Sequence, residues 1–102
     1  MIAPALNVSK ERLAEFCSRN AIRRLSLFGS VLTSGFSDGS DVDVLVEFEP
    51  GARVGYFRMA AMERELSELF EGRKVDLRTP SELSRYFRDE VVRTAAPQYV
   101  KE

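Results

Sequence analysis

Two short motifs stand out because their residue types suit phosphate and metal chemistry. Gly29 and Ser30 close an apolar run that ends at Phe28, and Asp41 and Asp43 open the next apolar run after ten intervening residues. A turn from a strand into a helix at Gly29-Ser30 presents backbone N–H groups, the serine hydroxyl and the positive helix end to phosphate oxygens. Gly29 and Ser30 are therefore candidate phosphate-binding residues.

Asp41 and Asp43 have the spacing that places two carboxylates on one face of an extended strand. If residues 41–48 form this strand, its opposite face carries the apolar side chains Val42, Val44, Val46 and Phe48. Neighbouring carboxylates repel each other and raise each other's pKa unless a cation lies between them. The pair therefore favours a hard divalent cation with oxygen ligands, Mg²⁺ above all.

A third carboxylate is expected from Asp76, which lies in the short run Lys74-Val75-Asp76-Leu77-Arg78. Its neighbours Val75 and Leu77 point one way and Asp76 the other, as a strand beside the first one requires. Three carboxylates can hold two metal ions roughly 3.5–4 Å apart, an arrangement that stabilises the attacking and leaving oxygens in phosphoryl chemistry. The reaction class predicted is nucleotidyl or phosphoryl transfer.

Simpler interpretations exist for the acidic residues. Residues 38–41 could form an ordinary turn, because Asp, Gly and Ser favour such positions. A calcium-binding loop that begins at Asp38 or at Asp41 fails, because apolar or acidic side chains stand at obligatory ligand or glycine positions. Asp76 could simply pair with Lys74 or Arg78, which lie two residues away on the same strand face.

Size and composition narrow the function further. The 102 residues suggest one domain over residues 1–102, and the net charge of −1 gives no support for a nucleic-acid partner. Cys17 is the one cysteine and there is no histidine, so zinc sites and histidine-based triads are excluded. We expect a cytoplasmic protein, because neither a signal peptide nor a membrane span is recognisable.

Periodicity predicts the elements that position these residues. We expect a helix after Ser9 that ends near Asn20, with Arg23 and Arg24 at its solvated end, then a strand over residues 25–28 and a short helix through residue 32. Residues 37–40 are expected to form the loop before the strand at 41–48.

The second half is predicted to contain a helix from Gly55 to Gly72, a strand over residues 73–79, and a last helix from Pro80 that Pro97 ends. The inner face of this last helix would hold Leu83, Phe87 and Val91. Strands that alternate with helices indicate an α/β (α+β) domain, with helices on one face of a small sheet. The other face carries the aspartates and should be partly open to substrate.

The segments FGSVLTSGFSDGSDVDVLVEFEPGARVGYF and GRKVDLRTPSELSRYFRDEV resemble the minimal nucleotidyltransferase family. This family, also called MNT or MntA, consists of short prokaryotic proteins in the superfamily of DNA polymerase beta. The resemblance spans about residues 10 to 100. It implies the nucleotidyltransferase fold, a small mixed sheet with an open active-site face.

The resemblance also implies Mg²⁺, in two ions, and ATP as the substrate. Gly29 and Ser30 would contact the phosphates, Asp41 and Asp43 would hold metal, and Asp76 would be a metal ligand or the base for the acceptor hydroxyl. Many relatives carry charged residues directly after Gly-Ser, whereas this chain has Val31, Leu32, Thr33, Ser34 and Gly35. The missing charge would then come from a partner or from Arg23, Arg24 or Lys74, and full competence of the site stays open.

For function, the family implies transfer of AMP to a tyrosine of a helical HEPN-type toxin, with this protein as the antitoxin. The alternative is a non-catalytic module that binds such a partner by contact alone. A third, weaker interpretation is a small-molecule nucleotidyltransferase similar to kanamycin nucleotidyltransferase. The sequence determines neither the acceptor nor the nucleotide base nor the oligomeric state.

Overall fold

The computed structural model describes residues 8–32 and 41–101. Its elements are α1 (Lys10–Arg19), β1 (Ile22–Phe28), the 3-10 helix η1 (Gly29–Leu32), β2 (Val42–Phe48), α2 (Tyr56–Leu69), β3 (Val75–Arg78), the 3-10 helix η2 (Pro80–Glu82), α3 (Arg88–Thr94) and β4 (Ala96–Val100). The described strands form one mixed sheet in the order β3-β2-β1-β4. β1 is antiparallel to β2 and β4, whereas β2 and β3 are parallel. β3 and β4 are therefore the sheet edges.

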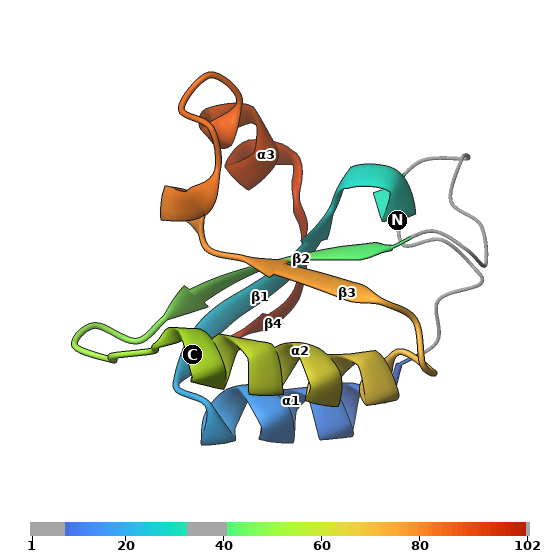
Figure 1. The fold of residues 1–102 in the computed structure, drawn as a ribbon. Coiled ribbons are helices and arrows are strands. Elements are labelled where there is room, and N and C mark those ends of the chain that lie inside the picture. Colours follow the sequence, from blue (N-terminus) through green and yellow to red (C-terminus); the bar gives the residue numbers. More distant parts are fainter. Residues whose placement is uncertain (1–7, 33–40, 102) are drawn as a thin grey trace.

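One face of the sheet is covered by α1 and α2, which lie side by side in Figure 1. α1 begins at Ser9, whose hydroxyl accepts a hydrogen bond from the backbone N–H of Arg12 at 3.3 Å. The buried residues of both helices join those of the sheet in one core, as the sequence predicts. The main core comprises Leu13, Phe16, Cys17, Ile22, Leu25, Leu27, Val42, Val44, Val46, Met62, Leu66, Leu69, Phe70, Val75 and Leu77.

The opposite face is only partly open. Leu45 of β2 is buried there with Leu83 and Ala95, and Phe28 and Val91 pack against this second cluster. Figure 1 shows α3 on this side of the sheet, opposite α1 and α2. The face that carries the aspartates is thus closed beyond Leu45 and open at the beginning of β2. The partly open second face agrees with the prediction, but helices on one face alone do not, because α3 lies on the second face and packs Val91 against the Leu45 cluster.

The prediction for the C-terminal region was wrong. In place of one helix from Pro80, the chain forms η2, the short α3 and a fourth strand, β4. Pro97 lies inside β4 and does not end a helix. Among the described strands β4 pairs with β1 alone, and an edge strand tolerates proline because one of its sides needs no hydrogen-bond donors. Phe87, expected inside, is 47% exposed, whereas Leu83 is buried and Val91 is partly buried as expected.

The predicted place of Arg23 and Arg24 was also wrong, because both belong to β1 and not to a helix end. Asn20 caps α1 with its backbone N–H and with its side chain, which donates to the carbonyl oxygen of Phe16 at 2.9 Å. Ala21 then turns the chain with a φ of 55°, so the strand starts earlier than predicted. The two arginines contact Glu47 at 3.6 and 4.0 Å.

The remaining elements agree with the predictions to within a few residues. β2 begins at Val42 rather than at Asp41, and β3 is shorter than the predicted range 73–79. α2 ends at Leu69, and Gly72 follows with a φ of +84°. The predicted loop at 37–40 lies outside the described residues. None of the helices in ranges 8–32 and 41–101 is long and apolar enough to cross a membrane.

Candidate active site

The sheet register places Asp43 directly opposite Asp76. The two residues are Cα partners in the parallel pairing of β2 with β3, flanked by the pairs Val42–Val75 and Val44–Leu77. The flanking side chains are buried under the helices, so both aspartates lie on the other face. Neighbouring strands are about 4.8 Å apart, which brings the two carboxylates within reach of one cation.

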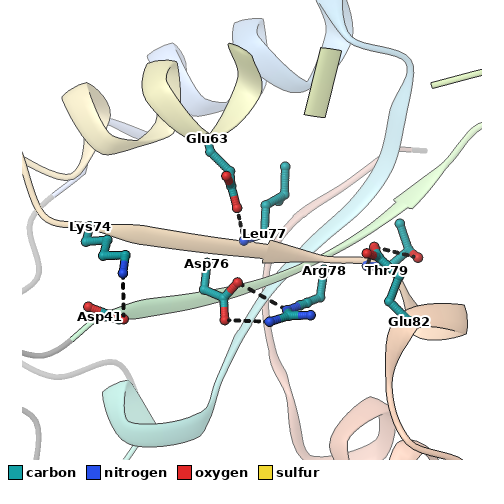
Figure 2. Close-up of polar contacts among 8 residues, drawn as sticks. All are labelled: Asp41, Glu63, Lys74, Asp76, Leu77, Arg78, Thr79 and Glu82. Carbon is teal, nitrogen blue, oxygen red and sulfur yellow. Dashed lines mark hydrogen bonds and ion pairs between the residues drawn. The ribbon is translucent and has the colours of Figure 1, made fainter. Parts of the chain in front are cut away.

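Asp41 lies at the same end of the sheet, directly before β2. The next residue, Val42, donates its backbone N–H to the carbonyl oxygen of Lys74 at 2.8 Å, which aligns Asp41 with the beginning of β3. The Lys74 ammonium is 3.9 Å from the Asp41 carboxylate (Figure 2). All three predicted metal-ligand residues therefore belong to two adjacent strand starts.

Gly29 packs its backbone against the Asp43 carboxylate. Phe28, the last residue of β1, is the register partner of Asp43, and Gly29 follows with a φ of +76°. A Cβ atom at Gly29 would lie 3.2 Å from Cγ of Asp43 and still closer to Oδ2. Only glycine fits this approach. Ser30 is the next residue of η1, so the Gly-Ser motif adjoins the aspartates as the sequence predicts.

The environment of Asp43 disfavours its negative charge. Burial raises the pKa of this carboxyl above its ordinary value, and the charges of Asp76 and Asp41 raise it further. The positive charge of Arg78 acts in the opposite direction. A divalent cation placed among these carboxylates would reverse the effect of burial and repulsion.

Strand β3 supplies its own cations to this face. The Arg78 guanidinium holds both oxygens of Asp76, with Nε 3.1 Å from Oδ1 and Nη2 3.3 Å from Oδ2 (Figure 2). The sequence left open which neighbour would pair with Asp76, and the structure selects Arg78, while Lys74 contacts Asp41. Within ranges 8–32 and 41–101, no three acidic, cysteine or histidine side chains converge closely enough to hold a metal ion in this arrangement.

The donor set nevertheless fits a hard divalent cation. Asp41, Asp43 and Asp76 offer only carboxylate oxygens, which suit a hard cation, and Asp43 and Asp76 are register partners on one face of the sheet. In this arrangement both oxygens of Asp76 accept hydrogen bonds from Arg78. The assignment of these residues as ligands remains a prediction.

Arg23 and Arg24 do not provide the cationic clamp considered from the sequence. Arg24 pairs in register with Glu47, whereas Phe28 pairs with Asp43, so both arginines lie at the far end of β1. η1 itself contains no charged residue, and Thr33 to Gly35 lie outside the described residues. Of the cations considered, only Lys74 lies beside the aspartates.

A cavity of about 640 Å³ adjoins the site at the outer edge of β3, and Asp76 and Arg78 line it together with Tyr56, Met59, Glu63 and Ser81. Glu63 of α2 accepts a hydrogen bond at 2.9 Å from the backbone N–H of Leu77, which occupies a donor on the free side of this edge strand (Figure 2). Sequence reasoning did not find Glu63, because helix periodicity marks it only as a polar position.

The profile of the family described as "Nucleotidyltransferase domain" matches residues 10–98 of the chain. The protein belongs to this nucleotidyltransferase family. The match covers both strands that carry the aspartates, and it agrees with the resemblance to the minimal nucleotidyltransferases stated from the sequence.

Comparison with individual proteins and solved structures agrees with this family. The Methanocaldococcus jannaschii protein named "Putative protein adenylyltransferase MJ0435" is 27% identical over 90 residues, which cover 88% of this chain and 94% of that protein. A solved structure of a "putative minimal nucleotidyltransferase" is 32% identical with a TM-score of 0.69, over 86% of this chain and 87% of that one. A crystal structure of a toxin–antitoxin with AMP-PNP has a TM-score of 0.72 over 93% of this chain and 76% of that one, at 16% identity, and thus shares the fold.

Proposed function

We propose that this nucleotidyltransferase moves AMP from ATP to a tyrosine hydroxyl of a helical HEPN-type toxin and thereby acts as its antitoxin. The observation that carries the proposal is the register pair of Asp43 with Asp76, with Asp41 alongside and the backbone of Gly29 against the Asp43 carboxylate. This is a compact acidic site next to a Gly-Ser turn, with open space beside it.

Each residue has a distinct role in this proposal. Gly29 and Ser30 bind the triphosphate through the backbone of the turn and the serine hydroxyl. Asp41, Asp43 and Asp76 would hold two Mg²⁺ ions, and the chemistry that bound Mg²⁺ would supply is neutralisation of phosphate charge and activation of the acceptor oxygen. The acceptor oxygen bonds to the α-phosphorus while the bond to pyrophosphate breaks, and Asp76 takes up the hydroxyl proton.

Direct transfer is favoured over a covalent enzyme intermediate. The chain has no histidine, and its one cysteine, Cys17, is fully buried in the core, with burial raising its pKa to about 12. A thiol in this state is a poor nucleophile, since the thiolate is the reactive form. This favours direct attack of the acceptor on the nucleotide.

Protein as the acceptor is supported by the archaeal relative, whose name describes a protein adenylyltransferase and which matches over nearly its whole length. The likeness to a toxin–antitoxin with AMP-PNP supports an adenine nucleotide and a toxin partner. The net charge of −1 gives no support for nucleic acid as the acceptor.

Intact-mass spectrometry tests the proposal. The product of the neighbouring reading frame is incubated with ATP, Mg²⁺ and this protein, and we expect addition of AMP that disappears with Asp41→Asn/Asp43→Asn. Equal modification by the double variant would mean that the carboxylates are wrongly assigned. Two separate peaks on size-exclusion chromatography after co-expression would contradict a stable complex.

A second candidate function is a non-catalytic module that neutralises the partner by contact alone. Two observations favour it: η1 carries no charged residue, and Arg78 already occupies Asp76. If the partner is inhibited yet its mass is unchanged, this alternative is correct. A melting temperature that does not change with ATP and Mg²⁺ would agree with it, because a ligand that binds the native state raises the melting temperature.

A further inference from the structure

Asp76 and Arg78 of β3, and Lys74 directly before it, share the face of the aspartates. Figure 2 shows the carboxylate of Asp76 turned toward the Arg78 guanidinium. Two N–H groups of the guanidinium, from Nε and Nη2, meet the two carboxylate oxygens at 3.1 and 3.3 Å. Both oxygens of the third carboxylate are thus already occupied by a cation.

The choice of partner by Arg78 is specific. The carboxylates of Asp76, Glu82 and Glu63 raise the pKa of Arg78, and the hydrogen bond to Asp76 is the main cause. Asp43 also interacts with the charge of Arg78, but no hydrogen bond joins these two residues in the described part of the chain. The other two are engaged by backbone groups: Glu82 accepts from the N–H of Thr79 at 2.9 Å, and Glu63 accepts from the N–H of Leu77 at 2.9 Å. Asp76 is the carboxylate left for the guanidinium.

We propose that Arg78 is the internal counter-ion of Asp76, so that it competes directly with metal for this carboxylate and lowers the affinity of the site for free metal. The proposal rests on the proposed function, in which Asp76 holds Mg²⁺. Arg78 is a positioning residue: it controls whether Asp76 is free to turn toward Asp43 and Asp41.

The solvent exposure of the Arg78–Asp76 pair determines how strongly Arg78 can lower metal affinity. The side chains of Arg78 and Asp76 are 46% and 37% exposed, so water screens the pair and its contribution is modest. Removal of Arg78 also takes away one positive charge that would lie a few ångströms from a bound divalent cation, and the loss of this repulsion raises metal affinity further. Together, we expect that removal of Arg78 raises metal affinity about three- to tenfold.

Lys74 provides a matched comparison. It carries the same charge beside the same strand face, but its side chain is 79% exposed and its ammonium lies 3.9 Å from one oxygen of Asp41. This contact is longer than a hydrogen bond and involves one oxygen of Asp41, whereas Arg78 contacts both oxygens of Asp76. Competition through direct occupation of ligand atoms therefore predicts a smaller effect for Lys74→Gln than for Arg78→Gln.

The test measures binding of Mn²⁺ without nucleotide by electron paramagnetic resonance of the free ion, so it does not depend on activity. We expect the affinities to rank Arg78→Gln above Arg78→Lys above the wild type, because lysine keeps the charge but cannot span both oxygens. Lys74→Gln should lie below Arg78→Gln. In the wild type, the Nε–H NMR signal of Arg78 should move when Mg²⁺ is added, and it should stay in place in Asp43→Asn.

Equal or weaker Mn²⁺ binding by Arg78→Gln overturns the counter-ion role while leaving the proposed function intact. An equal gain for Lys74→Gln and Arg78→Gln also overturns it, since general charge would then be the cause. If neither the wild type nor any variant binds Mn²⁺, both the counter-ion role of Arg78 and the metal-dependent function are refuted.

Discussion

Substitution of Gly29 by alanine tests the close approach of η1 to the active-site carboxylate. Gly29 has a φ of +76°, and the new Cβ would lie 3.2 Å from Cγ of Asp43 and closer to Oδ2. Two separate penalties result: strain of the backbone at residue 29, and displacement of the Asp43 carboxylate. The second penalty acts directly on the proposed metal site.

The two penalties can be estimated. A residue with a Cβ in the left-handed region costs about 1–2 kcal/mol. The Asp43 side chain must also leave its preferred rotamer, at a cost of about 0.5–1.5 kcal/mol. We therefore expect Gly29→Ala to lower the free energy of unfolding by about 1.5–3.5 kcal/mol. It should also weaken Mn²⁺ binding, because Asp43 no longer points into the site.

Urea unfolding of a double-mutant cycle separates the two penalties. In Asp43→Ala, the nearest remaining atom to the new Cβ is Cβ of residue 43 at 3.5 Å, an ordinary contact, so Gly29→Ala should cost only the backbone part. Asp43→Asn is the matched control: it keeps the shape of the side chain, so the full cost should persist. If Gly29→Ala costs the same in the Asp43→Ala background as in the wild type, steric contact with the carboxylate is refuted.

Three further outcomes are expected. Asp43→Asn should stabilise the metal-free protein at neutral pH by about 1 kcal/mol, the repulsion expected from a carboxylate on a neighbouring strand in a largely aqueous medium. Because the pKa of Asp43 is raised on folding, this gain in stability should be absent below the ordinary aspartate pKa, grow as the pH rises through the raised value, and then stay constant. Urea unfolding at a series of pH values measures the gain. A gain that is largest in acid would contradict the assignment. Glu63→Ala should destabilise the fold by about 1–2 kcal/mol, because the N–H of Leu77 loses its acceptor. Glu63→Gln should cost less, since an amide oxygen can still accept this hydrogen bond. Equal costs of the two substitutions in thermal unfolding would mean that the hydrogen bond is unimportant. Cys17 should resist a thiol reagent in the native state and react on unfolding, because its side chain is fully buried and its pKa is about 12; rapid native labelling would contradict this burial.

The sequence predicted the elements that carry a clear period. Val42, Val44 and Val46 recur at every second position, and this period was sufficient to place Asp43 on the face opposite the main core, although Leu45 on that same face is also apolar. The prediction from sequence failed near Pro97, because proline is compatible both with a helix end and with an edge strand. Only the free edge of β1, which is a tertiary property, decides between these possibilities.

In the candidate site, too, some features could be predicted from the sequence and others could not. The facing positions of Asp43 and Asp76 could be anticipated, since each lies in a short strand with the opposite face apolar. The partner of Asp76 could not be predicted, because Lys74 and Arg78 are both two residues away on the same face. Side-chain length and the planar, two-pronged guanidinium decide for Arg78, and these geometric terms are absent from a spacing pattern.

The position of Asp76 on β3 connects ligand binding with local unfolding. β3 has four residues and lies at the sheet edge, where strands open at a lower free energy than in the centre of a sheet. A ligand that bridges Asp43 and Asp76 binds only while β3 is docked on β2. Its measured affinity therefore includes the free energy of keeping this edge strand in place, and its binding slows hydrogen exchange of the β3 amides.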